Sequence, residues 1–130
     1  MEKLYEFYWD CGRQGSVSGL FIADEKAIDV SIGNEVSFGE ILGKHSDVYG
    51  YLEKCDLTVV DVSEKTVKEL KNALGYTISG YNPLNYITHT CVRCEKNIYA
   101  GDEDVYLKED EGSICSSCCS EEEEATLMLL

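Results

Sequence analysis

The chain is poor in positive charge. Its 130 residues include 25 acidic side chains but only 11 lysines and arginines, which gives a formal net charge of −14 at neutral pH. Binding to a nucleic-acid backbone or to anionic lipid headgroups depends on lysine and arginine. The composition therefore predicts no direct contact with nucleic acid and no docking to a membrane, and it favours a basic partner.

Long hydrophobic runs are also missing. No stretch of the sequence reaches the roughly 18 apolar residues that a membrane-spanning helix needs. The first ten residues, MEKLYEFYWD, contain four charged side chains and lack the apolar centre of a signal peptide. We therefore expect a cytoplasmic protein whose seven cysteines are reduced thiols.

Disorder is not indicated, because the chain has one proline and is 44% hydrophobic. Its character changes near residue 88. Residues 1–90 contain fourteen acids and eight bases, whereas residues 91–130 contain eleven acids, three bases and few large apolar side chains. We predict a domain at 1–88 and a small module at 89–130. The core of the module is thin, so it needs additional stabilisation by a metal ion or by cross-links.

The N-terminal domain is predicted to be α+β, with an antiparallel sheet and one or two helices. The segment 10–19 contains three glycines and predicts a loop. Aromatic and β-branched residues indicate strands on either side of that loop and further along the chain, at 4–9, 20–23, 35–42, 48–54 and 57–62.

Two helices are marked by their termini. Asp24 is a candidate N-cap of a short helix that ends before Gly33, and Ser63 or Asp61 could cap a longer helix that ends at Gly75. The spacing of apolar residues predicts that the longer helix packs through one stripe, formed by Val67, Leu70 and Leu74.

Five of the seven cysteines lie in CVRCEKNIYAGDEDVYLKEDEGSICSSCC, residues 91–119. They include two C-x2-C pairs separated by twenty residues. Two residues between cysteines allow both thiolates to face one ion, and two such pairs complete the tetrahedral shell of a structural Zn²⁺. Because four cysteines leave no open position, the pattern favours a structural metal over a catalytic one. Disulfides and an iron–sulfur cluster are the alternatives.

The residues between the pairs support this interpretation. NIYAGDEDVYL can form a strand, a turn at Gly101-Asp102 and a second strand, and the second pair is expected to open a helix at Ser116 or Ser117. Residues 91–124 thus resemble zinc-ribbon and LIM-like treble-clef modules. The resemblance implies that the ligands are Cys91, Cys94, Cys115 and Cys118.

Cys119 is an alternative fourth ligand, since it lies one position beyond Cys118. The acidic residues that follow it disfavour a reactive thiolate. The chain then ends in SEEEEATLMLL, which predicts an acidic and then apolar C-terminal helix. Its tip, Leu127–Leu130, is expected to dock on the N-terminal domain, to join a homo-oligomer or to fray.

Other candidate sites are weaker. CGRQGSVSG contains Arg13 but lacks the Gly-Lys-Ser/Thr ending of a phosphate-binding loop, so a turn is the better interpretation. Arg13 and His45 are retained as candidate ligand-binding residues. A nucleophile and base could be drawn from Cys11 or Cys55 with His45 or His89, although isolated cysteines are usually small apolar groups. We expect His89 to support a metal ligand or to be exposed.

Nine tyrosines are many for this length, and Tyr49 and Tyr51 alternate on one predicted strand. Exposed tyrosines beside acids would form a protein-binding surface. In size, charge and zinc appendage the chain resembles small acidic accessory proteins of bacteriophages, which implies a host or defence factor as partner and the host cytoplasm as location.

The leading hypothesis is a non-enzymatic, zinc-stabilised protein-binding or regulatory protein. One alternative is an acidic mimic of nucleic acid that inhibits a DNA- or RNA-binding enzyme. The other is a small-ligand binder or enzyme that uses the 10–19 loop.

Overall fold

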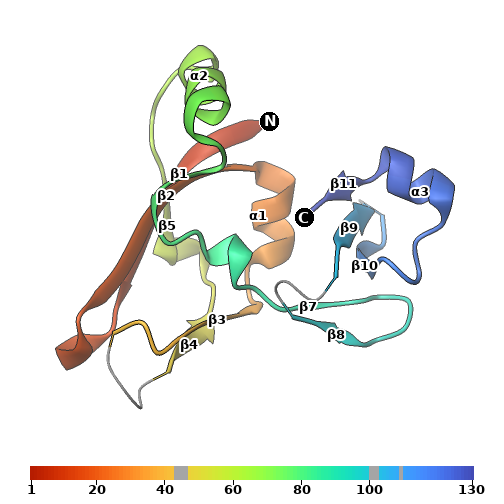
Figure 1. Ribbon diagram of the computed structural model, residues 1–130, viewed down its shortest axis with the longest axis horizontal. Coiled ribbons are helices and arrows are strands. Elements are labelled where there is room, and N and C mark those ends of the chain that lie inside the picture. Colours follow the sequence, from red (N-terminus) through yellow and green to blue (C-terminus); the bar gives the residue numbers. More distant parts are fainter. Residues whose placement is uncertain (43–46, 100–102, 109) are drawn as a thin grey trace.

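A computed structural model describes residues 1–42, 47–99, 103–108 and 110–130. It has the predicted α+β architecture, in which mostly antiparallel sheets are combined with three short α-helices over these ranges. Figure 1 shows a long N-terminal hairpin with its helices and, beside it, a smaller group of strands and one helix formed by the C-terminal residues. None of the described helices is long and apolar enough to cross a membrane.

The N-terminal sheet has four strands in the order β5-β1-β2-β6. β1 and β2 form its central hairpin, with Glu2 opposite Asp24 and Asp10 opposite Ser16. β5 and β6 flank this hairpin, and β5 is shorter than the strand predicted at 57–62. The four strands span Glu2–Asp10 (β1), Ser16–Asp24 (β2), Leu57–Val59 (β5) and Thr77–Gly80 (β6).

The loop predicted at 10–19 is wrong for its second half. Residues 16–19 belong to β2, and the connection shrinks to a 3-10 turn at Gly12–Gln14. Val17 is buried in the core, and Gly19 allows the chain to pass very close, because a Cβ there would lie 1.9 Å from the carbonyl oxygen of Tyr81. A glycine that reads as a turn residue is therefore needed for a tertiary contact.

Both predicted helices of this region form. α1 spans Glu25–Ser31 and is capped by the Asp24 side chain, which accepts a hydrogen bond from the amide of Lys26 at 2.9 Å. α2 spans Glu64–Leu74 and is capped by Ser63. Leu74 does not pack as predicted but is 58% exposed, because it ends the helix just before the chain turns back into β6.

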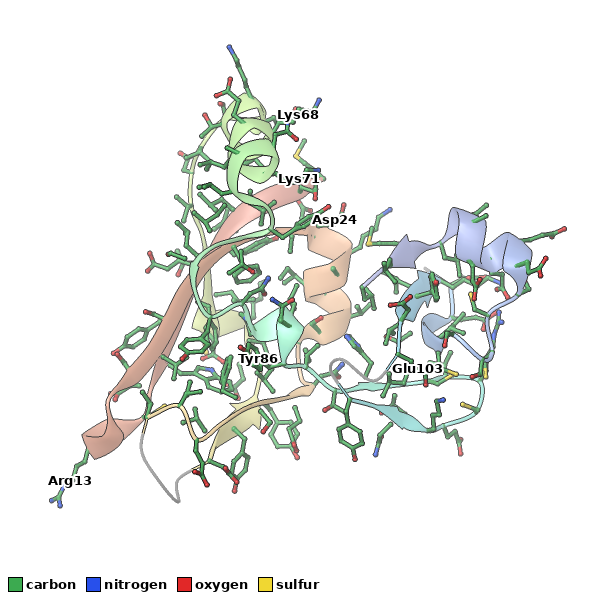
Figure 2. The ribbon with its side chains drawn as sticks, in the orientation of Figure 1. Arg13, Asp24, Lys68, Lys71, Tyr86 and Glu103 are labelled. Carbon is green, nitrogen blue, oxygen red and sulfur yellow. The ribbon has the colours of Figure 1, made fainter. Side chains whose placement is uncertain are left out.

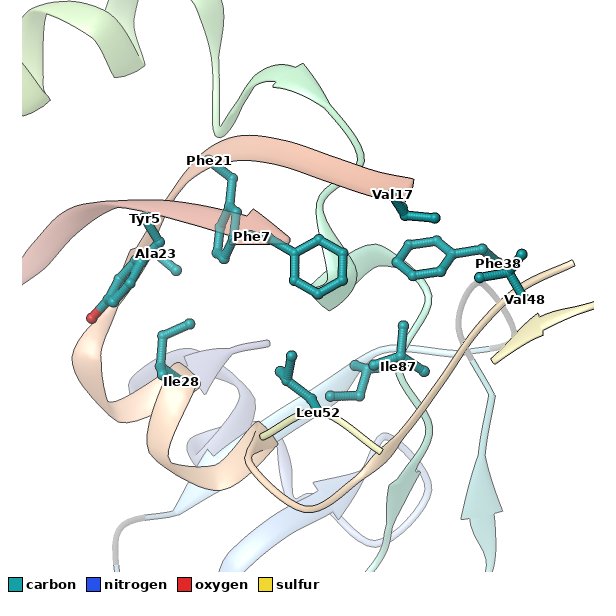
Figure 3. Packing of buried hydrophobic residues seen from close by; sticks show 11 residues of the cluster. Tyr5, Phe7, Val17, Phe21, Ala23, Ile28, Phe38, Val48, Leu52 and Ile87 are labelled. Atoms are coloured by element: carbon teal, nitrogen blue, oxygen red, sulfur yellow. The ribbon is translucent and has the colours of Figure 1, made fainter. Parts of the chain in front are cut away.

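The main core lies on one face of the sheet, under α1 and a second hairpin. This hairpin pairs β3, Glu35–Gly39, with β4, Val48–Tyr51, close to the predicted ranges. Figure 3 shows Phe7 and Phe38 at the centre of this core, with ring centroids 5.8 Å apart. Trp9 and Tyr86 also pack against Phe38. Each large side chain buried here contributes about 1.5–3 kcal/mol to stability.

The opposite face of the sheet is covered by α2. Leu4 and Ile22, which alternate with inward-facing residues of their strands, form a second apolar cluster there with Val67 of the helix. Two short 3-10 helices, Lys54–Asp56 and Pro83–Asn85, connect the remaining elements of the N-terminal region.

The C-terminal residues form two small sheets. β7, His89–Thr90, pairs with β8, Asn97–Ile98. The second sheet has the order β10-β9-β11 and consists of Val105–Lys108 (β9), Gly112–Cys115 (β10) and Met128–Leu129 (β11). The predicted hairpin between residues near 97 and 105 is therefore wrong, since β8 pairs with β7. The Gly101-Asp102 turn assigned to that hairpin lies outside the described residues.

The last helix, α3, begins later and ends earlier than predicted. It spans Glu121–Thr126 and is capped by Ser120, not by Ser116 or Ser117. The apolar residues after it are not helical. Met128 and Leu129 pair with β9, while Leu127 and Leu130 pack against the buried apolar cluster of this region. The apolar tip thus completes a sheet of its own region.

Apolar packing follows the same arrangement. Two of the clusters are built from residues 4–87, and a third is built from residues 91–130. The proposed domain boundary at residue 88 stays a prediction.

Candidate metal centre

Four cysteines meet at the turns that close the two C-terminal sheets. Cys91 and Cys94 lie in the turn between β7 and β8, whereas Cys115 ends β10 and Cys118 lies in the turn after it. Their four sulfur atoms lie within 4.8 Å of one another. This is the cluster that the C-x2-C spacing predicts.

The spacing of the sulfurs fits a tetrahedral ion. Bonds of about 2.3 Å from a central Zn²⁺ place neighbouring sulfurs about 3.8 Å apart. The Sγ atoms of Cys94 and Cys115, one from each pair, are separated by 3.7 Å. Cys91 and Cys115 are fully buried, whereas Cys94 is exposed and Cys118 is half-buried. An ion would therefore reach the cluster from the side of Cys94 and Cys118.

The first turn is shaped by backbone hydrogen bonds. The amide of Cys91 donates to Lys96 at 3.0 Å, and the amide of Glu95 donates back to Cys91 at 2.8 Å. Glu95 adopts a left-handed conformation with φ of 63°. The resulting tight turn brings β8 back alongside β7, which is why β8 does not pair with β9.

The thiols differ in their ease of ionisation. Burial opposes ionisation of Cys91, but backbone N–H groups of Cys115, Cys94 and Arg93 donate to its sulfur and lower its pKa to about 6. The thiol of Cys118 forms hydrogen bonds with the sulfurs of Cys115 and Cys94. These hydrogen bonds, together with burial, raise the pKa of Cys118 to about 12. Cys91 is thus held in a form that ionises readily, whereas Cys118 keeps a proton that a cation would replace.

Cys119 occupies a different place. It is half-buried against the apolar cluster of the C-terminal region and does not belong to the group of four sulfurs. Burial raises the pKa of its thiol, and the nearby Glu123 and Glu124 raise it further. This position explains why Cys119 is not the residue that completes the cluster.

Charged side chains connect the two turns around the cysteines. Arg93, between Cys91 and Cys94, forms ion pairs with Glu111 and Glu123. On another side, Lys96 forms an ion pair with Glu103, which also accepts a hydrogen bond from Ser116 in the second turn. The sequence shows these charges, but it does not show which of them meet.

His89 is buried. The prediction that it could be exposed is therefore wrong. Only 5% of its surface is accessible, and burial lowers its pKa. Its Nδ1 atom lies 3.3 Å from Nδ2 of Asn34 and 3.4 Å from Oγ of Ser113. His89 therefore joins the N-terminal region to β10.

Among the described residues, the other candidates, Arg13, Cys55 and Cys11, do not join the cysteine cluster. Figure 2 shows Arg13 at the tip of the β1–β2 hairpin, pointing away from the body of the molecule. His45, its proposed companion, lies outside the described residues. Cys55 is exposed and bonds to the carboxylate of Glu53, which raises the pKa of its thiol and disfavours a nucleophilic role. Cys11 is half-buried against the main core.

Comparisons with protein-family models, with curated proteins and with solved structures find no significant match to this chain. The class of protein is therefore stated from its fold and its cysteine cluster alone. The chain is an α+β protein with four cysteines close enough together to bind a metal ion, as in a zinc-ribbon-like module.

Proposed function

We propose that the chain is a non-enzymatic, zinc-stabilised protein that binds and regulates another protein. The observation that carries the proposal is the closed set of four sulfurs formed by Cys91, Cys94, Cys115 and Cys118. Soft thiolate ligands in a tetrahedral arrangement favour Zn²⁺, and a shell filled by protein leaves no position for a substrate or a reactive water.

Zinc would have a structural role in this reading. The apolar cluster of the C-terminal region contains few large buried side chains apart from its cysteines, chiefly Ile98, Val105 and Ile114. Binding of a structural Zn²⁺ by four ligands can be worth about 10–16 kcal/mol. That exceeds what three aliphatic side chains supply at about 1.5–3 kcal/mol each.

A surface on the β3–β4 hairpin supports the binding role. Tyr49 and Tyr51 are 68% and 65% exposed, whereas Gly50 between them faces Trp9 of the core. β4 pairs only with β3 among the described strands, so no described strand occupies the edge where an extended segment of a partner could add. Tyrosine offers a large contact area at low entropic cost, which makes this pair a suitable anchor for a partner.

The charge of the chain indicates the chemistry of the partner. A net charge of −14 attracts basic proteins and repels acidic ones at low ionic strength. The host or defence factor implied by the likeness to phage accessory proteins stays a prediction. So do the nucleic-acid mimic and the ligand-binding role of the 10–19 loop.

Two measurements test the proposal. Native mass spectrometry of protein purified with reductant should show one bound zinc ion per chain, and a metal-free protein would refute the structural role. Affinity capture from a cell extract should then compare the native chain with Tyr49→Ser/Tyr51→Ser. Loss of a captured protein with this variant is the expected result.

A matched control removes the same number of tyrosines elsewhere. Tyr8→Ser/Tyr99→Ser replaces two residues that are 53% and 56% exposed on other strands and segments. It should retain the partner. If both variants lose the captured protein equally, the β3–β4 hairpin is not the binding surface. If the native chain captures no specific protein, the binding role is refuted. A captured enzyme that DNA or RNA displaces would favour the mimic.

A further inference from the structure

Arg93 makes an unusually complete set of contacts. It donates to Glu111 at 3.0 and 3.2 Å, to Glu123 at 2.8 and 2.6 Å, and to the carbonyl oxygen of Cys118 at 2.7 Å. These five bonds use every N–H group of the guanidinium. Both carboxylates are held by paired bonds, a geometry that lysine cannot reproduce.

These contacts connect four segments that are separate in the sequence. Arg93 lies in the first cysteine turn, Glu111 in the turn between β9 and β10, and Cys118 in the second cysteine turn. Glu123 lies in the first turn of α3, where its side chain also accepts the backbone N–H of Ser120. One side chain thus ties the first cysteine pair to the fourth cysteine and to the helix that follows it.

The charge arrangement suits a bound cation with four thiolates, which together have a formal charge of −2. Lys108 joins Arg93 in pairing with Glu111 and Glu123, so these two carboxylates are balanced by two cations. The group formed by Arg93, Lys108, Glu111 and Glu123 therefore adds no net charge beside the cysteine turns. Groups that orient metal ligands in this way commonly change metal affinity when removed.

α3 depends on this anchor. It has six residues, a length at which a helix is not stable alone in water. The amide of Leu127 donates to Glu123, and the amide of Leu130 donates to Val105 of β9 at 2.8 Å. The docking of β11 thus begins at the residue that Arg93 holds.

We propose that Arg93 is a positioning residue that links ion occupancy at the four cysteines to the docking of α3 and β11. The ion holds the sulfur of Cys118 while Arg93 holds its carbonyl group and Glu123, so the loss of either releases the C-terminal segment. This linkage rests on the proposed zinc site.

The linkage has a consequence for the surface of the protein. Met128, Leu129 and Leu130 line a groove of about 610 Å³ together with residues of the N-terminal region, among them Ile22 and Leu84. Figure 1 shows the C-terminus close to α1, where this groove lies. Ion occupancy would therefore determine whether the C-terminal residues line this groove.

Hydrogen–deuterium exchange on the full chain tests the linkage. With one equivalent of Zn²⁺, peptides covering 125–130 should exchange slowly, and chelation should accelerate them. With zinc still bound, Arg93→Gln should accelerate exchange of the same peptides by about tenfold or more. Amides of the first cysteine turn should stay protected in that variant, which separates undocking of α3 and β11 from general unfolding.

Two further variants make the result specific. Arg93→Lys keeps the charge but not the paired bonds, so it should give an intermediate rate. Lys71→Gln removes a cation of the same 29% side-chain exposure that pairs with Glu2 at 2.6 Å in the N-terminal region, and it should leave residues 125–130 unchanged. If Arg93→Gln does not fold, Glu123→Gln tests the same anchor from its other end.

The outcomes distinguish the two proposals. Zinc binding with exchange at 125–130 that ignores both chelation and Arg93→Gln would overturn the linkage and leave the zinc site standing. A protein that binds no zinc by native mass spectrometry would overturn both. Acceleration by Lys71→Gln equal to that by Arg93→Gln would show a general loss of stability and would also overturn the linkage.

Discussion

Replacing Cys118 or its neighbour Cys119 by serine is a sensitive test of the metal centre. The two positions are adjacent, both side chains are half-buried, and each substitution changes one sulfur to oxygen. Only Cys118 contributes its sulfur to the group within 4.8 Å. The pair of variants therefore differs in ligation and in little else.

The magnitude follows from sharing the binding energy among the ligands. If four thiolates together provide about 10–16 kcal/mol, one of them accounts for about 2.5–4 kcal/mol. Cys118→Ser should therefore weaken zinc binding by roughly 10²- to 10³-fold, since 1.4 kcal/mol corresponds to about a factor of ten. Cys119→Ser loses only part of the packing of a small side chain and should bind zinc within about threefold of the native chain.

Competition with a colorimetric chelator measures both affinities, and circular dichroism with and without zinc reports folding of the C-terminal region. Equal losses in the two variants, or a larger loss in Cys119→Ser, would refute the assignment of the fourth ligand. Native affinity in Cys118→Ser would refute the four-sulfur site altogether.

Three further predictions concern the N-terminal region. Phe38→Ala should lower the free energy of unfolding by about 3–5 kcal/mol in denaturant titrations, because Phe38 is buried against four other aromatic rings. A loss below about 1 kcal/mol would contradict the packing described. Gly19→Ala should cost about 1–3 kcal/mol or more, since a Cβ would collide with the carbonyl of Tyr81, and a native thermal midpoint would show that β2 and β6 are not so close. Asp24→Ala should cost about 0.5–2 kcal/mol at neutral pH. The backbone amide of Lys26 donates a hydrogen bond to the Asp24 carboxylate and lowers its pKa. The stability that this bond provides is therefore fully present at pH values above the usual pKa of an aspartate, and it is lost as the pH falls through the lowered pKa. A difference in stability between the variant and the native chain that persists at pH 2 would contradict this cause.

The predictions from sequence succeeded where the signal is local. Asp24 and Ser63 cap their helices because an N-cap acts on amides two or three residues away. Aromatic residues indicate a strand at 4–9, and Tyr5, Phe7 and Trp9 lie on one face of β1, since the side-chain period of a strand is two. The C-x2-C pairs likewise allow two sulfurs of one turn to converge without reference to the rest of the chain.

Predictions failed where distant segments compete for the same residues. Gly19 indicates a turn by itself, yet the backbone of Tyr81 passes over it and makes it part of β2. Leu127–Leu130 continue a helical pattern, yet as an extended segment they pair with β9 and pack against the buried apolar cluster of the C-terminal region.

The sequence by itself therefore determined the α+β class, the helix caps and the gathering of cysteines into pairs, because these depend on neighbours within one turn or one strand. Only the tertiary structure decided that β8 pairs with β7, that His89 is buried between two regions, and that Arg93 reaches Glu111, Glu123 and the carbonyl of Cys118. These contacts join residues far apart in the chain, and their energies depend on burial and geometry that no local pattern encodes.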